Sequence, residues 1–248
     1  MNLKGLLAEH VSHCLYINLD RSTQRRAEFE KWAKDLPFRR IQGVDGQTLD
    51  ETCLTSRNES CLLGNSDIQK RGAIGCAMSH LKAIEKAISL ITSGDQRPVL
   101  IMEDDVWIPD ANLPILESVL RSGQTGDHCL LLGWHEIQQG FFPIATEHPH
   151  IVEPSGALSA TAYLVSPRML PVLRDVYRFN LERPDMQLVD CVNTKMHRFL
   201  ALRDLFPIYG SYEEDLLQEF KRSCIINNIG EIGTFEGPKF RAVDPPII

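Results

Sequence analysis

Apolar residues along this chain fall into two kinds of pattern, which alternate from the N-terminus onward. Short continuous apolar runs, such as Cys14-Leu-Tyr-Ile-Asn-Leu19, are typical of strands buried on both faces. Longer stretches repeat apolar residues every three to four positions, which is the period of an amphipathic helix. The predicted strands are residues 14–19, 38–44, 98–102, 129–132 and 160–165, and the predicted helices are residues 20–35, 72–91, 113–121, 167–177 and 185–199.

The order of these elements predicts the fold class. Apolar strands separated by helices are typical of an α/β fold with a largely parallel sheet. Residues 47–71 are polar and predict a long loop, and the proline-containing tail from Gly230 onward predicts irregular structure. Because no segment has the composition of a linker, we expect a single domain over residues 1–248.

The net charge and the cysteine pattern limit the classes of binding partner and the cellular compartment that we expect. The formal net charge is -7, and the clustered Lys and Arg that nucleic acid binding needs are missing, so we expect no nucleic acid partner. The seven cysteines form no CxxC pair, which favours free thiols in a reducing compartment. The first eleven residues are too polar for a signal peptide, and no apolar run reaches the ~18 residues of a membrane span. We therefore expect a cytoplasmic protein, peripheral at most to the inner face of a membrane.

Three consecutive acids, Glu103-Asp104-Asp105, follow directly on the apolar strand at residues 98–102. In a parallel α/β sheet, ligands bind beyond the carboxyl ends of the strands. Adjacent carboxylates repel unless a cation neutralises them, and Mg²⁺ or Mn²⁺ prefers such oxygen ligands. If the extended backbone continues, Glu103 and Asp105 point to the same side. The triplet predicts a metal site with Asp105 as first ligand, helped by Glu103; a solvent-facing acidic strand end is the alternative.

Two glycines open the helix predicted over residues 72–91, in the segment Gly72-Ala-Ile-Gly-Cys-Ala-Met-Ser-His80. Glycine allows a ligand to approach the backbone, and the free N–H groups of a first helical turn can hold an anion. Ser79 and His80 lie two turns further on, within reach of a nucleotide or a phosphate. The alternative is a glycine-eased loop with His80 as a satisfied, partly buried histidine.

Polar residues also follow the first predicted strand, in Asn18-Leu-Asp-Arg21. They lie at the same edge of the predicted sheet as the acidic triplet and are candidates to contact the same ligand. The alternative is helix capping by Asp20 or Ser22 with ion pairing by the arginines.

Taken together and in order, these segments resemble glycosyltransferase family 25, which includes lipopolysaccharide sugar transferases and collagen galactosyltransferases. One departure is Ala73, where the family often has Glu. The likeness spans residues 14–166 and thins beyond Ser166 to Pro184-Asp185 with Leu188. The matching segments are Tyr16-Ile-Asn-Leu-Asp-Arg21 with Arg25-Arg26, Val44-Asp-Gly46, Gly72-Ala-Ile-Gly-Cys76 with Ser79-His80, Val99-Leu-Ile-Met-Glu-Asp-Asp105, Asp127 with Leu131-Leu-Gly133, and Ala162-Tyr-Leu-Val-Ser166.

The resemblance implies a GT-A type fold and a metal-assisted, inverting transfer of a hexose, for which galactose and glucose are the leading candidates. A Rossmann-like half over about residues 1–135 would bind a UDP-sugar, and a half over about residues 136–248 would bind a saccharide or glycolipid acceptor. Mn²⁺ or Mg²⁺ would lie on Glu103 and Asp105. The implied donor-binding residues are Asn18, Leu19, Arg21, Asp45, Gly46, Ser79, His80 and Asp104.

An inverting transfer also needs a general base on the acceptor side, usually Asp or Glu. Asp185 follows Pro184 at the start of a predicted helix, where the helix dipole favours a carboxylate, and Asp190 is the second candidate. A helix cap is the alternative role for Asp185. Two other function classes stay open: a non-catalytic member that binds a glycan or a partner, and a different metal-dependent enzyme that acts on phosphates.

Overall fold

The computed structural model of the chain describes residues 2–50, 67–123, 129–132, 135–136, 144–145, 147–153, 157–158, 161–179 and 199–202. The helices are α1 (Leu3–His10), α2 (Thr23–Trp32), η1 (Gly46–Thr48), α4 (Asp67–Leu90), η3 (Asp110–Asn112), α5 (Leu113–Arg121) and α6 (Met169–Phe179). The strands are β1 (His13–Asn18), β2 (Phe38–Gln42), β3 (Val99–Glu103), β4 (Cys129–Leu131), β5 (His135–Glu136), β6 (Ile144–Ala145), β7 (Ile151–Glu153), β8 (Ala157–Leu158), β9 (Ala162–Val165) and β10 (Phe199–Leu202).

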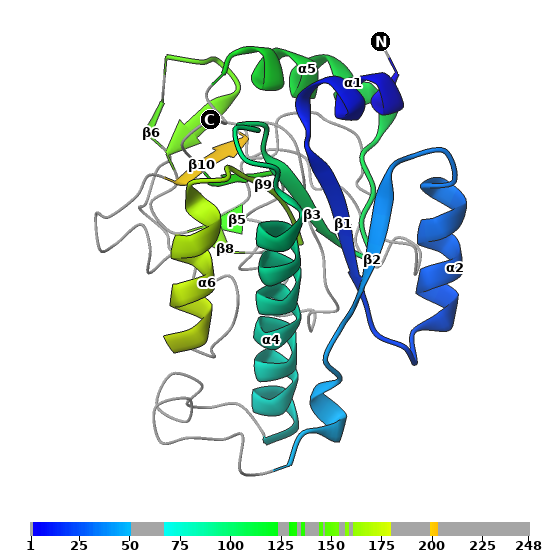
Figure 1. Cartoon of the computed structure of the whole chain (residues 1–248). Helices are drawn as coiled ribbons and strands as arrows, with labels where there is room; N and C mark the ends of the chain where they lie inside the picture. The colour runs from blue at the N-terminus through cyan, green and yellow to red at the C-terminus, as the bar shows by residue number, and fades with distance from the viewer. Residues whose placement is uncertain are drawn as a thin grey trace, which may run out of the picture.

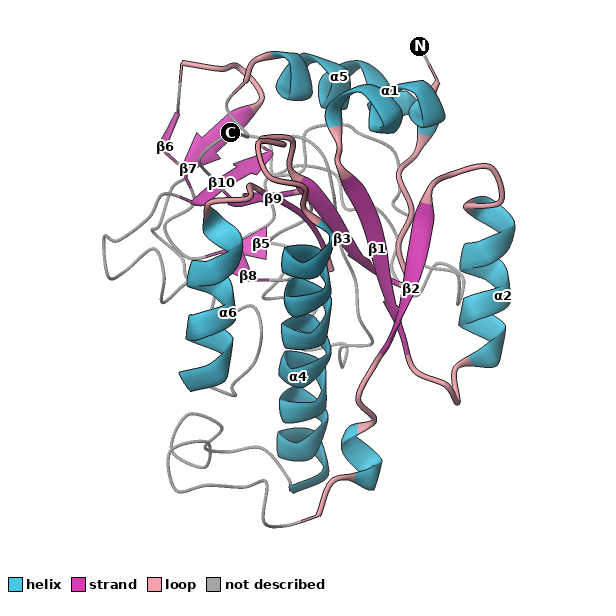
Figure 2. Ribbon diagram, viewed as in Figure 1, coloured by secondary structure: helices cyan, strands magenta, loops and turns pink. Residues whose placement is uncertain are grey.

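Eight strands form one mixed sheet in the order β2-β1-β3-β9-β4-β10-β7-β6 (Figure 2). Strand β1 pairs in parallel with both β2 and β3, and β4 pairs in parallel with β10. Strand β9 is inserted antiparallel between β3 and β4. The predicted α/β fold is confirmed. Since β9 and β10 come from beyond residue 135, both predicted halves contribute strands to this sheet, and the expected division is not a break in it.

Helices cover both faces of the sheet, and strand alternation divides the core between them (Figure 1). On one face, Cys14 and Tyr16 of β1 pack with residues of α1, α2 and α5. On the other, Leu15 and Ile17 pack with residues of α4 and α6. Because β1 is buried on both faces, its sequence is continuously apolar, as predicted.

Helix α2 is held to β1 and β2 by an aromatic cluster. Phe29 is fully buried and stacks on Tyr16 with ring centroids 4.3 Å apart. Trp32 and Phe38 each pack against Phe29 with centroids at 5.3 Å. Such pairs add about 0.5–1.5 kcal/mol each beyond the burial of their area. This packing fixes the N-terminal turn of α2, which carries Arg25, beside the carboxyl end of β1.

The predicted elements were placed correctly except at two points. Helix α4 begins at Asp67, so Gly72 lies inside the helix, and residues 67–71, predicted to belong to a loop, are helical. Phe199, predicted to end a helix, begins strand β10. The rest of that predicted helix and the tail from Gly230 lie outside the described residues.

Two further expectations concern membranes and thiols. No helix within the described ranges is both long and apolar enough to cross a membrane. Three of the cysteines fall in the described residues, and none of the three is in a disulfide. Cys14 and Cys129 are buried, as expected for thiols that serve as small core residues, whereas Cys76 is partly exposed.

Candidate functional site

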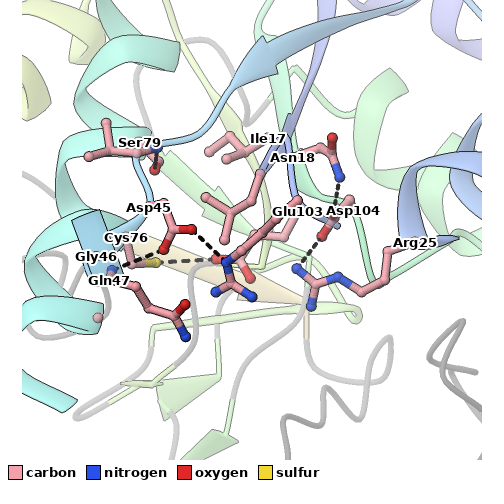
Figure 3. A pocket seen from close by; sticks show the side chains of 14 residues that line it. Ile17, Asn18, Arg25, Asp45, Gly46, Gln47, Cys76, Ser79, Glu103 and Asp104 are labelled. Carbon is pink, nitrogen blue, oxygen red and sulfur yellow. Dashed lines mark hydrogen bonds and ion pairs between the residues drawn. The ribbon is translucent and has the colours of Figure 1, made fainter. Parts of the chain in front are cut away.

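A pocket lies at the carboxyl ends of β1 and β3, two neighbouring parallel strands (Figure 3). The register aligns Ile17 with Glu103, so the residues that follow each strand meet at one edge of the sheet. The pocket has a volume of about 240 Å³ and is walled on its other sides by α4 and by the segment that leads into η1. The sheet edge that was predicted to bind a ligand therefore carries a pocket.

The strand periodicity sends neighbouring acids to opposite faces of the sheet. Val99 and Ile101 face α4, and Glu103 continues this series, so its carboxylate meets α4. Asp104 turns to the other face, where it meets α2. Strand β3 ends at Glu103, and Asp104 and Asp105 lie in a turn. The condition under which Glu103 and Asp105 would share a side is therefore not met, because the extended backbone does not continue past Glu103.

Asp104 is buried and held by two donors. Arg25 Nη2 lies 2.9 Å from its Oδ1, and the Asn18 side-chain amide donates to its Oδ2. Burial raises the pKa of Asp104, while the charge of Arg25 and the hydrogen bond from Asn18 oppose the rise. Asn18 also accepts from Arg40 Nε at 2.9 Å, which fixes the amide with its nitrogen toward Asp104.

Asp105 is the least satisfied acid of the triplet. Arg25 Nη1 lies 3.4 Å from its Oδ2, but its Oδ1 is buried and has no hydrogen-bond partner among the described residues. Burial, together with the nearby charges of Glu103 and Asp104, raises the pKa of Asp105 to about 7 against the opposing charge of Arg25. Asp104 and Asp105 thus share one guanidinium, which leaves this pair of carboxylates short of positive charge.

Glu103 is oriented by a chain of buried side chains. Its Oε1 lies 3.1 Å from His80 Nε2 and 3.7 Å from Cys76 Sγ. The other ring nitrogen of His80, Nδ1, lies 2.9 Å from the Tyr163 hydroxyl. Burial favours a raised pKa for Glu103, but the hydrogen bond and charge of His80, together with Arg25, outweigh it and lower the pKa. His80 is fully buried and does not line the pocket.

Two further side chains form the rim opposite the acids. Arg21 Nε donates to Asp45 Oδ2 at 2.6 Å, and the Gln47 backbone N–H donates to Asp45 Oδ1 at 2.9 Å. The hydrogen bond from Gln47 lowers the pKa of Asp45 most, burial opposes it, and Arg21 lowers it further. Arg21 is half exposed, so this pair contributes little to stability and its guanidinium can turn toward an anion.

Two glycines let the wall of the pocket close tightly. A Cβ on Gly75 would lie 2.7 Å from the Gly46 nitrogen, and one on Gly46 would lie 2.3 Å from the Arg71 carbonyl oxygen. Ser79 joins the same contact, since its hydroxyl donates to Gly75 O and accepts from the Val44 N–H, both at 2.7 Å. Gly75 therefore serves close packing between α4 and the segment before η1, and not the first turn of a helix as predicted, since α4 begins at Asp67.

The sequence comparisons identify the family. The model of glycosyltransferase family 25, described as an LPS biosynthesis protein family, matches residues 11–148, more than half of the chain. The chain belongs to glycosyltransferase family 25. A "Glycosyltransferase 25 family member" of Anopheles gambiae is 33% identical over 103 residues, which cover 39% of this chain and 17% of that protein.

A second family 25 relative, the "Probable inactive glycosyltransferase 25 family member 3" of Rattus norvegicus, is 29% identical over 154 residues. This match covers 59% of the chain and 26% of the relative, so the chain spans about a quarter or less of either relative. Among solved structures, "The crystal structure of apo- UDP-glucose pyrophosphorylase" aligns with a TM-score of 0.40 and 11% identity, over 77% of this chain and 90% of that one.

The structure brings most of the predicted site residues of this family 25 chain together. His80 and Asp105 do not line the pocket, while Asp185 and Asp190 lie outside the described residues. Six residues that line the pocket were not among the predicted site residues: Ile17, Arg25, Val44, Gln47, Gly72 and Cys76. Arg25 and Cys76 belong to the segments that carry the family resemblance, which was a usable signal. The predicted residues that line the pocket are Asn18, Leu19, Arg21, Asp45, Gly46, Ser79, Glu103 and Asp104.

The acidic side of the pocket fits a hard divalent cation. Asp105 Oδ1 is a buried carboxylate oxygen without a partner in the described residues, and each recorded hydrogen bond of Glu103 uses Oε1, which leaves Oε2 to a ligand. Carboxylate oxygens are the donors that Mg²⁺ or Mn²⁺ prefers. These two oxygens are the ones that would hold the ion, and the metal site expected from the sequence stays a prediction.

Proposed function

We propose that this chain transfers a hexose from a UDP-sugar to a hydroxyl of a saccharide or glycolipid acceptor. Galactose and glucose are the leading candidates for the hexose. The observation that carries the proposal is the pocket at the ends of β1 and β3, where acids and arginines meet within the segment that matches the family. A nucleoside diphosphate needs cationic partners, and the two carboxylates that follow β3 need a cation.

The donor is proposed to lie between the acids and the rim of the pocket. Arg21 is half exposed at that rim and can reach a phosphate without losing a buried contact. Arg25 is already held between Asp104 and Asp105, so it orients the acids and does not bind phosphate. Asn18 and Ser79 keep the walls in place through their hydrogen bonds. Specificity for uridine rests on the family resemblance.

Mn²⁺ or Mg²⁺ is proposed to bind Glu103 and Asp105, with Asp104 beside them. When bound, the cation would neutralise the charge that develops on the leaving diphosphate. Arg25 keeps Asp104 and Asp105 on the α2 side, and the link from Tyr163 through His80 keeps Glu103 on the α4 side. The carboxylates are thus held from two independent elements of the fold.

The proposed reaction is a single in-line displacement with inversion. The acceptor hydroxyl oxygen forms a bond to the anomeric carbon, the bond from that carbon to the diphosphate oxygen breaks, and UDP leaves. The hydroxyl proton passes to a carboxylate on the acceptor side, for which Asp185 and then Asp190 are the candidates. The acids after β3 face the leaving group and do not serve as this base.

A non-catalytic role is the second candidate, because the rat relative is named as probably inactive. Against it, the acids Glu103, Asp104 and Asp105 are intact in this chain and one carboxylate oxygen is left for a ligand. We place the enzyme in the cytoplasm, with at most peripheral association with a membrane that carries its acceptor.

One experiment separates these roles. The purified chain is incubated with a panel of UDP-sugars and Mn²⁺, with and without EDTA, and free UDP is measured. A transferase releases UDP slowly by donor hydrolysis, only with Mn²⁺ and only from the correct sugar; release of inorganic phosphate from monoesters indicates a phosphate-handling enzyme instead. Stabilisation by a UDP-sugar without UDP release, even when oligosaccharide acceptors are added, supports the binding role.

A further inference from the structure

Three potential ligands of a softer metal ion converge behind the acidic edge of the pocket. Cys76 Sγ, His80 Nε2 and one carboxylate oxygen of Glu103 lie within 4.8 Å of one another. Cys76 and His80 are four residues apart on α4, so their side chains project from the same face of that helix, and Glu103 meets them from β3. Thiol, imidazole and carboxylate are the donor types that Zn²⁺ accepts together.

The spacing of these atoms agrees with tetrahedral coordination. Bonds of about 2.0–2.3 Å from zinc to oxygen, nitrogen and sulfur place neighbouring ligands of a tetrahedron roughly 3.3–3.8 Å apart. The observed separations are 3.1 Å from His80 Nε2 to Glu103 Oε1 and 3.7 Å from Cys76 Sγ to the same oxygen. These two separations lie near the tetrahedral range, and the third, between Cys76 Sγ and His80 Nε2, is within 4.8 Å. We propose that Cys76, His80 and Glu103 form a site for a thiophilic divalent cation of the Zn²⁺ class.

The surroundings of His80 supply the outer partner that a metal-bound imidazole needs. Its ring is fully buried, and Nδ1 lies 2.9 Å from the Tyr163 hydroxyl. A hydroxyl both donates and accepts. When Nε2 binds an ion, the ring proton moves to Nδ1 and is donated to the Tyr163 oxygen, while the Cys76 thiol proton leaves to solvent. A ligating histidine that donates through its other nitrogen is the usual arrangement in metal sites.

The site opens toward the pocket on one side. Cys76 and Glu103 line the pocket (Figure 3), whereas His80 is fully buried and does not line it. Three protein ligands leave a fourth position, which here faces the pocket and is free for water or a small ligand. This inference goes beyond the proposed transfer: its ion is bound through a thiolate, whereas the cation for transfer is bound through oxygen. The two ions share Glu103.

The test compares the affinity of a soft and a hard ion in matched variants, without donor, acceptor or turnover. Zn²⁺ is titrated in competition with a chromophoric chelator, and Mn²⁺ is measured by electron paramagnetic resonance of the free ion. Cys76→Ser should lower the affinity for Zn²⁺ by at least about 100-fold, because the loss of an outer partner alone lowers metal affinity about 10–100-fold. It should leave the affinity for Mn²⁺ within about threefold of the wild type. Asp105→Asn is the reciprocal control and should leave Zn²⁺ almost unchanged.

A second readout uses the unmodified protein, so that it stands even if a variant folds poorly. Saturating Zn²⁺ should protect Cys76 from iodoacetamide, as followed by mass spectrometry of its peptide, while Mn²⁺ should not. Co²⁺ in place of Zn²⁺ should give a thiolate charge-transfer band that Cys76→Ser removes. The proposal is overturned if the protein binds no equivalent of Zn²⁺, if Cys76→Ser binds it as tightly, or if Cys76 is not protected. These outcomes leave the proposed transferase untouched, because none of them measures it.

Discussion

The strongest single prediction is that replacing a proposed metal ligand stabilises the metal-free protein. Asp105 has a buried carboxylate oxygen without a partner among the described residues, and burial beside Glu103 and Asp104 raises its pKa from 3.8 to about 7. At about 1.36 kcal/mol per pKa unit, its ionisation in the folded protein costs roughly 4 kcal/mol. Asp105→Asn removes that cost, which already includes the attraction of Arg25. It also leaves a buried amide whose N–H groups cannot accept from the Arg25 guanidinium, which costs about 1–2 kcal/mol. We expect a net gain of about 2 kcal/mol.

The sign of this effect depends on pH. Because the folded-state pKa of Asp105 lies above its unfolded value, the folded protein holds more protons than the unfolded one between about pH 4 and 7. The contribution of this carboxyl to stability is therefore complete below pH 4 and is lost as the pH rises through about 7. The advantage of Asp105→Asn should be absent near pH 4 and complete near pH 8.

The assay is urea unfolding in EDTA and in saturating Mn²⁺, at several pH values. In EDTA at pH 8 the Asp105→Asn protein should be the more stable one. Mn²⁺ at 100 times its dissociation constant should add about 2.7 kcal/mol to the wild type and much less to the variant, so the order reverses. Asp35→Asn changes the same charge at an exposed position and should shift stability by less than about 0.5 kcal/mol. An Asp105→Asn protein that is less stable in EDTA at pH 8, or equally stabilised by Mn²⁺, refutes the reasoning.

Three further predictions test the walls of the pocket and the base. Gly75→Ala should lower stability by about 2 kcal/mol or more and weaken UDP-sugar binding, since its Cβ meets backbone at 2.7 Å, whereas Gly72→Ala, with open space, should raise stability by up to about 1 kcal/mol in thermal unfolding. Tyr163→Phe should cost about 1–3 kcal/mol in urea unfolding, because it leaves buried His80 Nδ1 without its partner, and should raise the Mn²⁺ concentration needed for half-maximal turnover. Asp185→Asn should lower turnover by ~10²–10⁴-fold with donor affinity unchanged, and if only Asp190→Asn does so, the base is Asp190.

The local sequence pattern was sufficient to predict the two strands whose ends carry the pocket. The strands predicted at residues 14–19 and 98–102 match β1 and β3 to within about a residue, because strands buried on both faces leave a continuous apolar run. Their parallel pairing then places Asn18 and Glu103 at one edge without any further information. Most of the predicted pocket residues follow from that one step.

The errors have equally local causes. Residues 67–71 of α4 are mostly polar, so the apolar stripe that marked the helix appears only from Ile74, and the glycines were taken for its start. Strand β10 is a four-residue apolar run, which periodicity cannot distinguish from the end of a buried helix. The link from Tyr163 to Glu103 through His80 depends on β9 lying antiparallel to β3, which no local pattern specifies.

The residue at which β3 ends determines which side chains each of the three acids contacts. An extended backbone through residue 105 would place Glu103 and Asp105 together on the α4 side and leave Asp104 alone with Arg25. Because the strand stops at Glu103, Arg25 instead lies between Asp104 and Asp105, while Glu103 is left to Cys76 and His80. Glu103 thus has a thiol and an imidazole beside it, whereas Asp104 and Asp105 have Arg25, and Asp104 also has the amide of Asn18. This arrangement is the structural reason to expect that a thiophilic cation takes Glu103 with Cys76 and His80, whereas a hard cation takes Glu103 with Asp105.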